Sequence, residues 1–251
     1  MSLKIKSISS ATHKGRRPYQ EDRFFTLTAE QGTLVAVFDG HGGDECSQRC
    51  SEDFPVLFAD AISAPKITVR KALERSIHNL AVQTDYFVPG TTLSAVFIPA
   101  RGNFVTAAVI GDSPIIIKDS DANLQIGPDH NVRTNYDERL AAEARGGFVS
   151  DGYLCASFNG PGLQMARALG DAQLRAVLSR TPEIYRVRMD KHGYIIVATD
   201  GAFDPGHYDF KKASESVVSL VEAGAEAQAV VDYAVNVPTG DNVTAIIVRF
   251  E

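Results

Sequence analysis

The sequence predicts an α+β protein in which helices cover a largely antiparallel sheet. Six short apolar runs have the length and β-branched content of buried strands: Leu34–Phe38, Leu93–Ile98, Phe104–Ile110, Ile115–Ile117, Tyr194–Ala198 and Val243–Val248. Five residues separate the second run from the third, and four separate the third from the fourth, which is too short for a parallel crossover. These strands are clustered, with amphipathic helices before and after them, and this order favours α+β over a doubly wound parallel fold.

Helical spacing is clearest in two segments, Ile67–Tyr86 and Phe210–Val235, where apolar residues recur three and four apart. We expect shorter helices at Asp44–Phe58, Asn135–Arg145 and Gln173–Ser179. A glycine-rich stretch, Gly146–Gly162, separates the last two, and we expect it to form a mobile surface excursion beside the functional site.

The amino-acid composition is typical of a single globular domain. The chain has 251 residues, 44% of them hydrophobic, and no Pro/Ser-rich linker or charge run divides it, so we expect one domain over residues 1–251. The net charge of −6 gives no basic footprint for nucleic acids or anionic membranes, so we expect neither as a partner. We expect a monomer.

Targeting and redox features are those of an intracellular protein. The first residues lack the apolar stretch of a secretion signal, and no window reaches the length of a membrane span, so we expect a cytoplasmic location. The three cysteines, Cys46, Cys50 and Cys155, do not form a disulfide framework, and we interpret them as reduced thiols.

Three aspartates adjoin predicted strands. Asp39 ends one apolar run and precedes Gly-His-Gly-Gly, Asp200 closely follows another, and Asp241 lies just before a third. A single Asp-Gly usually marks a turn, but the repetition favours convergence of the carboxylates on one sheet edge. Oxygen donors without a Cys/His set select Mg²⁺ or Mn²⁺ over Zn²⁺. Ca²⁺ stays open as an alternative, although the chain has no EF-hand loop.

Eight short motifs, in order along nearly the whole chain, resemble those of the metal-dependent type 2C serine/threonine protein phosphatases. They are Arg17-x-x-x-Glu21-Asp22, Asp39-Gly-His-Gly-Gly43, Gly90-Thr-Thr92, Gly111-Asp-Ser113, Asp129-His130, Arg167-Ala-Leu-Gly-Asp171, Asp200-Gly201 and Asp241-Asn242. The resemblance implies a single phosphatase domain with a four-layer α-β-β-α sandwich, two antiparallel sheets between helices, and a binuclear metal site at one edge. It also implies hydrolysis of phosphoserine and phosphothreonine in proteins by a metal-activated water, without a covalent phosphoenzyme.

The resemblance also implies metal ligands. Asp39 would bridge two Mg²⁺ or Mn²⁺ ions, and Asp200 and Asp241 would complete the first ion's protein ligands. Glu21 and the carbonyl of Gly40 would hold the second. A third ion would involve Asp200 together with two further aspartates, Asp129 and Asp204.

Two side chains match the family's positions for substrate chemistry. Arg17 would bind the phosphate, because a planar guanidinium grips two oxygens where a lysine offers a point charge. His41 would be the general acid for the departing serine or threonine oxygen, a task that suits an imidazole. We expect supporting hydrogen bonds from Asp22, Asp112 and Asp171, and structural roles for Thr91 and Thr92.

Two alternatives keep the fold and change the function. A non-catalytic, phosphoprotein-binding regulatory module would be marked by loss of Asp39, Asp200 or Asp241, and all three are present. A hydrolase of small phosphoesters or phosphodiesters would use the same site. The Gly146–Gly162 stretch falls where the family has its flap, and we expect it to influence substrate choice.

Overall fold

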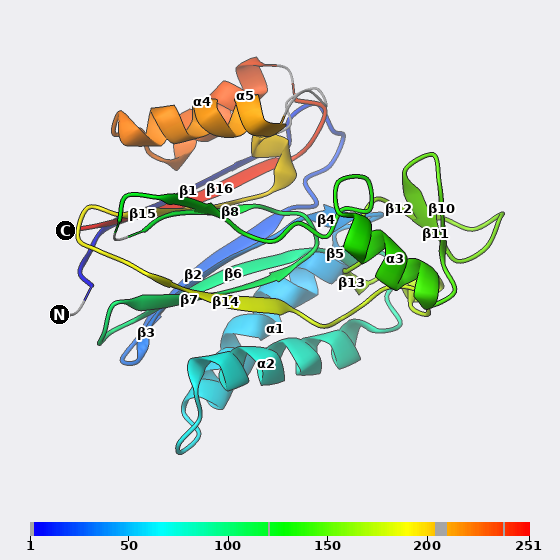
Figure 1. Cartoon of the computed structure of the whole chain (residues 1–251), viewed down its shortest axis with the longest axis horizontal. Helices are drawn as coiled ribbons and strands as arrows, with labels where there is room; N and C mark the ends of the chain where they lie inside the picture. The colour runs from blue at the N-terminus through cyan, green and yellow to red at the C-terminus, as the bar shows by residue number, and fades with distance from the viewer. Residues whose placement is uncertain (1–2, 120, 204–209, 238) are drawn as a thin grey trace.

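Two five-stranded antiparallel sheets, stacked face to face with helices on both outer sides, form the centre of the molecule (Figure 1). The computed structural model describes residues 3–119, 121–203, 210–237 and 239–251. One sheet has the order β1-β16-β15-β8-β9, with bounds Ile5–His13, Val243–Phe250, Tyr194–Ala198, Ile115–Lys118 and Leu124–Ile126. The other has the order β14-β7-β6-β3-β2, with bounds Glu183–Arg188, Phe104–Ile110, Leu93–Pro99, Gly32–Phe38 and Arg23–Ala29. The predicted four-layer α+β sandwich is confirmed.

Apolar side chains from both sheets meet in the middle of the sandwich. Val37 and Val109 of one sheet belong to the same buried cluster as Ile117, Val197 and Ile246 of the other. Because side chains alternate between the two faces of a strand, the opposite faces of both sheets are free to pack against helices. This double packing explains why the central strands read as continuous apolar runs.

Helices cover the two outer faces. Helices α1 (Glu45–Ile62) and α2 (Val69–Thr84) pack on the sheet that contains β3, and Thr68 caps α2 by accepting a hydrogen bond from the backbone of Lys71. On the other side, α4 (Phe210–Glu222) and α5 (Ala227–Asn236) cover β1 and β16. The sequence predicted one helix over this last segment. The helix is interrupted at Gly224, whose φ of 97° lies in the left-handed region that ends helices.

Some predicted elements differ from the structure. The prediction omitted β1, β2, β9 and β14, which are the outermost strands of the two sheets. The helix predicted at Gln173–Ser179 is instead a single 3-10 turn, η1 (Ala172–Leu174). The turn itself buries Leu174. The other apolar residues that suggested a longer helix, Val177 and Leu178, are buried in the same cluster without being helical.

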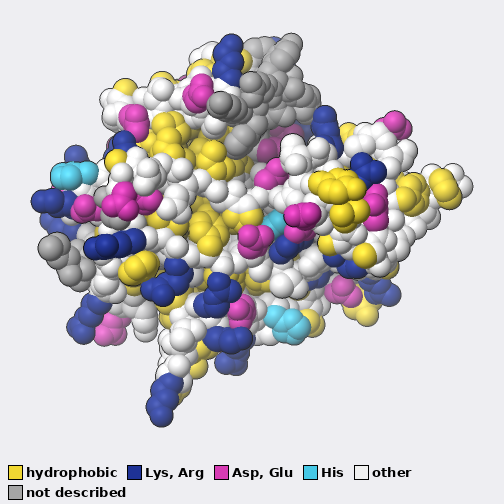
Figure 2. All heavy atoms as spheres, viewed as in Figure 1, with side chains coloured by type: hydrophobic (Ala, Val, Ile, Leu, Met, Phe, Trp, Pro, Cys, Tyr) yellow, Lys and Arg dark blue, Asp and Glu magenta, His cyan; other side chains and the backbone are white. Residues whose placement is uncertain are grey.

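A smaller lobe lies at one end of the sandwich. It contains α3 (Tyr136–Ala144) and a three-stranded sheet of β10 (Phe148–Ser150), β11 (Tyr153–Cys155) and β12 (Gly162–Leu163), which occupies the stretch predicted as a flap. Apolar side chains are exposed here, including Tyr136, Leu140 and Phe158, and Figure 2 shows apolar surface at this end of the molecule. Among the described residues, no helix has the length and apolar character needed to cross a bilayer.

Candidate metal centre

Asp39 lies between β3 and β4 (Gly40–His41), at the end of the buried sheet. Its backbone is held by the Gly90-Thr-Thr92 motif: the Asp39 N–H donates to Thr92 Oγ1 at 3.0 Å, and its carbonyl accepts from the N–H of Thr92 at 3.0 Å and from Thr91 Oγ1 at 3.1 Å. The Thr92 hydroxyl is itself bonded to Ser113 Oγ at 2.7 Å. Two motifs therefore orient Asp39, a function more specific than the structural role expected of the threonines.

Asp200 is brought next to Asp39. It begins the 3-10 turn η2 (Asp200–Ala202) just after β15, and its carboxyl group lies close enough to that of Asp39 for each to affect the pKa of the other. Burial raises the pKa of Asp39 well above the ordinary 3.8, and the charge of Asp200 raises it further. Burial likewise raises the pKa of Asp200, followed by the charge of Asp112. Two carboxylates held this close favour a shared proton or a cation between them.

Asp39 and Asp200 belong to a group of neighbouring carboxylates, the acidic cluster, that also includes Asp22, Asp112 and Asp241. Asp241 lies at the edge of this cluster. Its Oδ2 accepts a hydrogen bond from Arg17 Nη2 at 2.8 Å, and Arg17 Nε donates to the carbonyl of Gly240 at 2.8 Å. The charge of Asp241 contributes to the raised pKa values of both Asp39 and Asp200. The predicted phosphate-binding arginine and a predicted metal ligand are therefore ion-paired in this structure.

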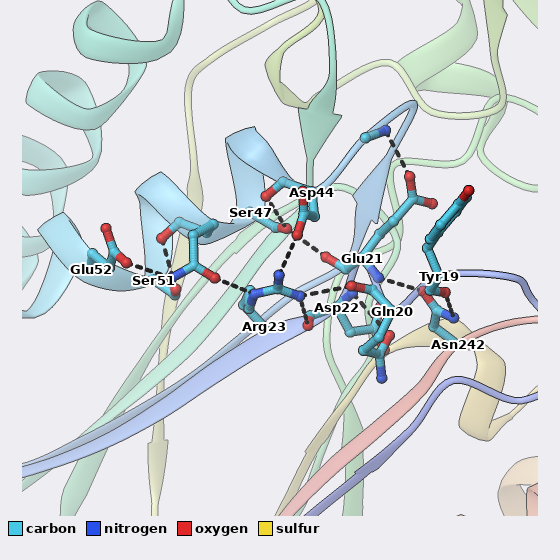
Figure 3. Close-up of polar contacts among 12 residues, drawn as sticks. Tyr19, Gln20, Glu21, Asp22, Arg23, Asp44, Ser47, Ser51, Glu52 and Asn242 are labelled. Carbon is cyan, nitrogen blue, oxygen red and sulfur yellow. Dashed lines mark hydrogen bonds and ion pairs between the residues drawn. The ribbon is translucent and has the colours of Figure 1, made fainter.

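Glu21 is held at the centre by contacts from three directions, most of them visible in Figure 3. Its backbone N–H donates to Asn242 Oδ1 at 2.8 Å, and its Oε1 accepts from the N–H of Gly43 at 2.7 Å. A Cβ on Gly40 would lie 2.3 Å from the Glu21 carbonyl oxygen, so only glycine lets the two segments pack this closely. Glu21 and Gly40, both expected at the second ion, are thus neighbours.

Asn242 joins the loop that carries Arg17 and Glu21 to the start of β16. Besides accepting from Glu21, its side-chain amide donates to the carbonyl of Tyr19 at 2.9 Å (Figure 3). It also donates to the carbonyl of Lys14 at 2.9 Å. No role for Asn242 was expected from the sequence, because nothing local to an Asp-Asn pair indicates partners more than 200 residues away.

Asp22 and Asp112 lie within the acidic cluster as well. Asp22 Oδ2 accepts from the hydroxyls of Thr199 at 2.9 Å and Thr244 at 2.8 Å, as expected of a supporting residue, and burial raises its pKa to about 7. Burial also raises the pKa of Asp112 to about 6, and Asn131 Nδ2 donates to its Oδ2 at 2.9 Å. One oxygen of each aspartate, Asp22 Oδ1 and Asp112 Oδ1, is buried without a hydrogen-bond partner.

The residues expected at a third ion are less clearly arranged. Both oxygens of Asp129 are engaged in a turn: Oδ1 accepts from the N–H of Asn131 at 2.9 Å, and Oδ2 accepts from Thr134 Oγ1 at 2.5 Å. The charge of Asp129 nevertheless raises the pKa of the neighbouring Asp112. Asp204 lies outside the described residues.

The donor set suits a hard divalent cation. Figure 2 shows acidic side chains gathered where the sandwich meets the smaller lobe. Asp39 and Asp200 lie among like charges that raise their pKa values, and two neighbouring carboxylate oxygens have no partner. Oxygen-only ligands of this kind match Mg²⁺ or Mn²⁺, because a cation would neutralise the charge and take up the free lone pairs.

Within the described part of the chain, the one group of three side chains with all donor atoms within 4.8 Å lies elsewhere, at His130, Glu138 and Glu183. The predicted metal ligands do not form a group that tight. At the His130 cluster, however, Arg167 bonds both oxygens of Glu138 and lies 3.9 Å from Glu183. The guanidinium of Arg167 already offsets part of the charge of those carboxylates, so we interpret this cluster as an ion-pair network.

His41 lies next to the acidic cluster, two residues after Asp39 in the chain, and its side chain is 26% exposed. Its Nε2 is hydrogen-bonded to the carboxylate of Asp171. A cavity of about 330 Å³ opens beside the pair and is lined on its apolar side by Val88, Leu163 and Leu174. His41 thus faces an open cavity beside the acidic cluster, and this position suits proton transfer to a bound ligand.

Residues 8–243 match the family model described as Protein phosphatase 2C. Among curated relatives, "Probable protein phosphatase 2C 56" of Oryza sativa subsp. japonica is 27% identical over 96% of this chain and 69% of its own length. A solved Caenorhabditis elegans sex determining protein superposes with a TM-score of 0.82 at 26% identity, over 100% of this chain and 65% of that one. The catalytic domain of the serine/threonine protein phosphatase PstP, solved with two manganese ions, has a TM-score of 0.66 at 21% identity, and 99% of each chain is covered.

Proposed function

Because this chain belongs to the protein phosphatase 2C family, we propose that the acidic cluster at the end of its sandwich is the phosphatase centre. Its homologues are metal-dependent protein serine/threonine phosphatases, and the chain is an enzyme of that class with phosphoproteins as substrates. The observation that carries the assignment to these residues is the gathering of Asp39, Asp200 and Asp241 beside two carboxylate oxygens, Asp22 Oδ1 and Asp112 Oδ1, that are buried without a hydrogen-bond partner. Nothing in the described residues favours the regulatory alternative.

We propose two bound ions, either Mg²⁺ or Mn²⁺. Asp39 would contact both ions, Asp200 and Asp241 would hold the first, and Glu21 with the Gly40 carbonyl would hold the second; the manganese pair in the PstP domain supports this number. When bound, the ions lower the pKa of a coordinated water and offset the charge of the phosphate. A third ion near Asp129 stays a prediction, as does the monomeric state.

The chain's own residues supply positioning and proton transfer. Arg17 would exchange its ion pair with Asp241 for two phosphate oxygens, since its planar guanidinium can bind them in parallel. His41 would donate a proton to the serine or threonine oxygen as the bond to phosphorus breaks, because an alkoxide is a poor leaving group. Thr91 and Thr92 would keep Asp39 in place throughout.

Phosphate release from a phosphothreonine peptide tests this function. The purified protein would be treated with a chelator, assayed, and assayed again with Mn²⁺ or Mg²⁺, with a phosphodiester as the competing substrate and Asp39→Asn as the inactive control. We expect no turnover after chelation, recovery with metal, and a strong preference for the peptide. Chelator-resistant turnover, or a preference for the diester, would reject the proposal.

A further inference from the structure

His41 and Asp171 form a close pair at the mouth of the centre, from positions 130 residues apart in the chain. His41 Nε2 lies 3.0 Å from Oδ1 and 2.9 Å from Oδ2 of Asp171, so both carboxylate oxygens face one ring nitrogen. Asp171 is 8% exposed, and its side chain does not cap the turn η1 that begins after it. The carboxylate is therefore directed to the histidine and not to its own helical turn.

Three two-residue strands bring the partners together. Strand β5 (Gly90–Thr91) lies between β4 and β13 (Leu169–Gly170), and Gly90 is paired with His41 on one side and with Gly170 on the other. A Cβ on Gly90 would lie 1.9 Å from Asp171 Oδ2 and 2.4 Å from His41 Nε2. The side chains of His41 and Asp171 therefore pack directly on the Cα of Gly90, and any side chain at position 90 would push them apart.

The backbone of Asp171 is held rigidly. Its φ of 53° lies in the left-handed region that aspartate and asparagine tolerate better than most residues. Its N–H donates to the carbonyl of Pro89 at 3.3 Å, and Arg180 donates to the carbonyl of Ala168 at 2.9 Å and to that of Gly170. A carboxylate fixed in this way can restrict the orientation of the imidazole that it contacts.

We propose that Asp171 is the positioning residue for His41: it holds Nε2 and leaves Nδ1 to deliver the proton to the substrate. This inference rests on the proposed phosphatase function. In the step, a water oxygen bonds to phosphorus, the bond from phosphorus to the serine or threonine oxygen breaks, and that oxygen takes the proton from His41. The water leaves one proton on the phosphate, and the other passes through solvent to restore His41. Both partners line the 330 Å³ cavity, where the substrate chain would lie.

Asp171→Asn is the main test, because asparagine keeps the volume, tolerates the backbone conformation and removes the charge. General acids contribute roughly 10²–10⁴-fold, so for a phosphothreonine peptide we expect kcat to fall by about 10- to 100-fold with KM unchanged. For p-nitrophenyl phosphate, whose leaving group needs little protonation, we expect a loss of less than about threefold. In a His41→Gln background, Asp171→Asn should cause no further loss.

Asp119→Asn is the matched control. Asp119 is also 8% exposed and accepts hydrogen bonds, from Gln125 Nε2 at 2.7 Å and the N–H of Asn123 at 2.9 Å, but it follows the far end of β8. This variant should lower the melting temperature without changing the ratio of the two kcat values. Equal losses on both substrates for Asp171→Asn, or additive losses with His41→Gln, would overturn the inference.

Two further measurements separate this inference from the proposed function. Gly90→Ala leaves both partners chemically intact, and we expect it to reproduce the leaving-group dependence of Asp171→Asn. In ¹⁵N spectra of the metal-free protein with neutral imidazole, His41 should carry its proton on Nε2, and Asp171→Asn should change that pattern. A wild-type protein without turnover would reject the phosphatase proposal, whereas a His41 spectrum unaffected by Asp171→Asn would reject the pairing itself.

Discussion

Asn242→Ala removes the side chain that ties the Glu21 loop to β16, and its effect can be estimated from the structure. Asn242 is 4% exposed and makes three side-chain hydrogen bonds, at 2.8 Å to Glu21 and at 2.9 Å to Lys14 and Tyr19. Each such bond contributes about 1 kcal/mol net, so we expect the free energy of unfolding to fall by about 3 kcal/mol. Domains of this kind have about 5–15 kcal/mol available, and the variant should still fold.

The same change should weaken metal binding. The released loop carries Glu21, and side chains that orient metal ligands typically contribute about 10- to 100-fold to affinity. Urea unfolding in chelator gives the stability change, and calorimetric titration with Mn²⁺ gives the affinity. Thr68→Ala, which removes the cap of α2 far from the centre, is the control: it should lower stability and leave Mn²⁺ affinity unchanged. If Asn242→Ala lowered stability with unchanged Mn²⁺ affinity, the placement of Glu21 among the ligands would be wrong.

Three other perturbations have defined outcomes. Asp39→Asn should abolish turnover yet raise the melting temperature of the chelated protein, because it removes a charge from a cluster whose pKa values are already raised; a lower melting temperature would contradict the like-charge argument. Arg17→Ala should mainly raise KM for phosphopeptides in steady-state assays, and an unchanged KM would remove Arg17 from phosphate binding. In chelator, melting temperature should fall as pH rises from about 4 to 7, because the folded-state pKa values of Asp22 (about 7) and Asp112 (about 6) exceed the ordinary 3.8. The stabilisation from protonating these carboxyls in the folded state is complete below 3.8 and lost above the raised values, so a flat profile over that range would count against it.

The interior of both sheets was predictable, and their edges were not. The six predicted strands correspond to β3, β6, β7, β8, β15 and β16, which are all interior strands. An interior strand is buried on both faces and reads as a continuous apolar run. The omitted strands are edges such as β14, where buried Ile184 and Val187 are interspersed with exposed or half-exposed residues. That pattern is hard to distinguish from a loop.

At the site, local signals revealed residue types but not partners. Asp39 and Asp200 were recognisable because each follows an apolar run, and the prediction that they converge agrees with their proximity in the structure. The contact between His41 and Asp171 depends on strands of two residues, which are too short to give any periodic pattern. Asp112 was expected only to support its neighbours, yet its charge is the largest electrostatic influence on Asp200. Such proximities arise from tertiary packing, which a single sequence does not display.

The claim that Asp39 bridges two metal ions is tested most directly by anomalous diffraction from crystals soaked in Mn²⁺. We predict two manganese peaks in contact with the Asp39 carboxylate, one also bound by Asp200 and Asp241 and the other by Glu21 and the Gly40 carbonyl. In Asp39→Asn crystals, at least one of these peaks should be lost. A single peak, or manganese bound instead at His130, Glu138 and Glu183, would contradict the account.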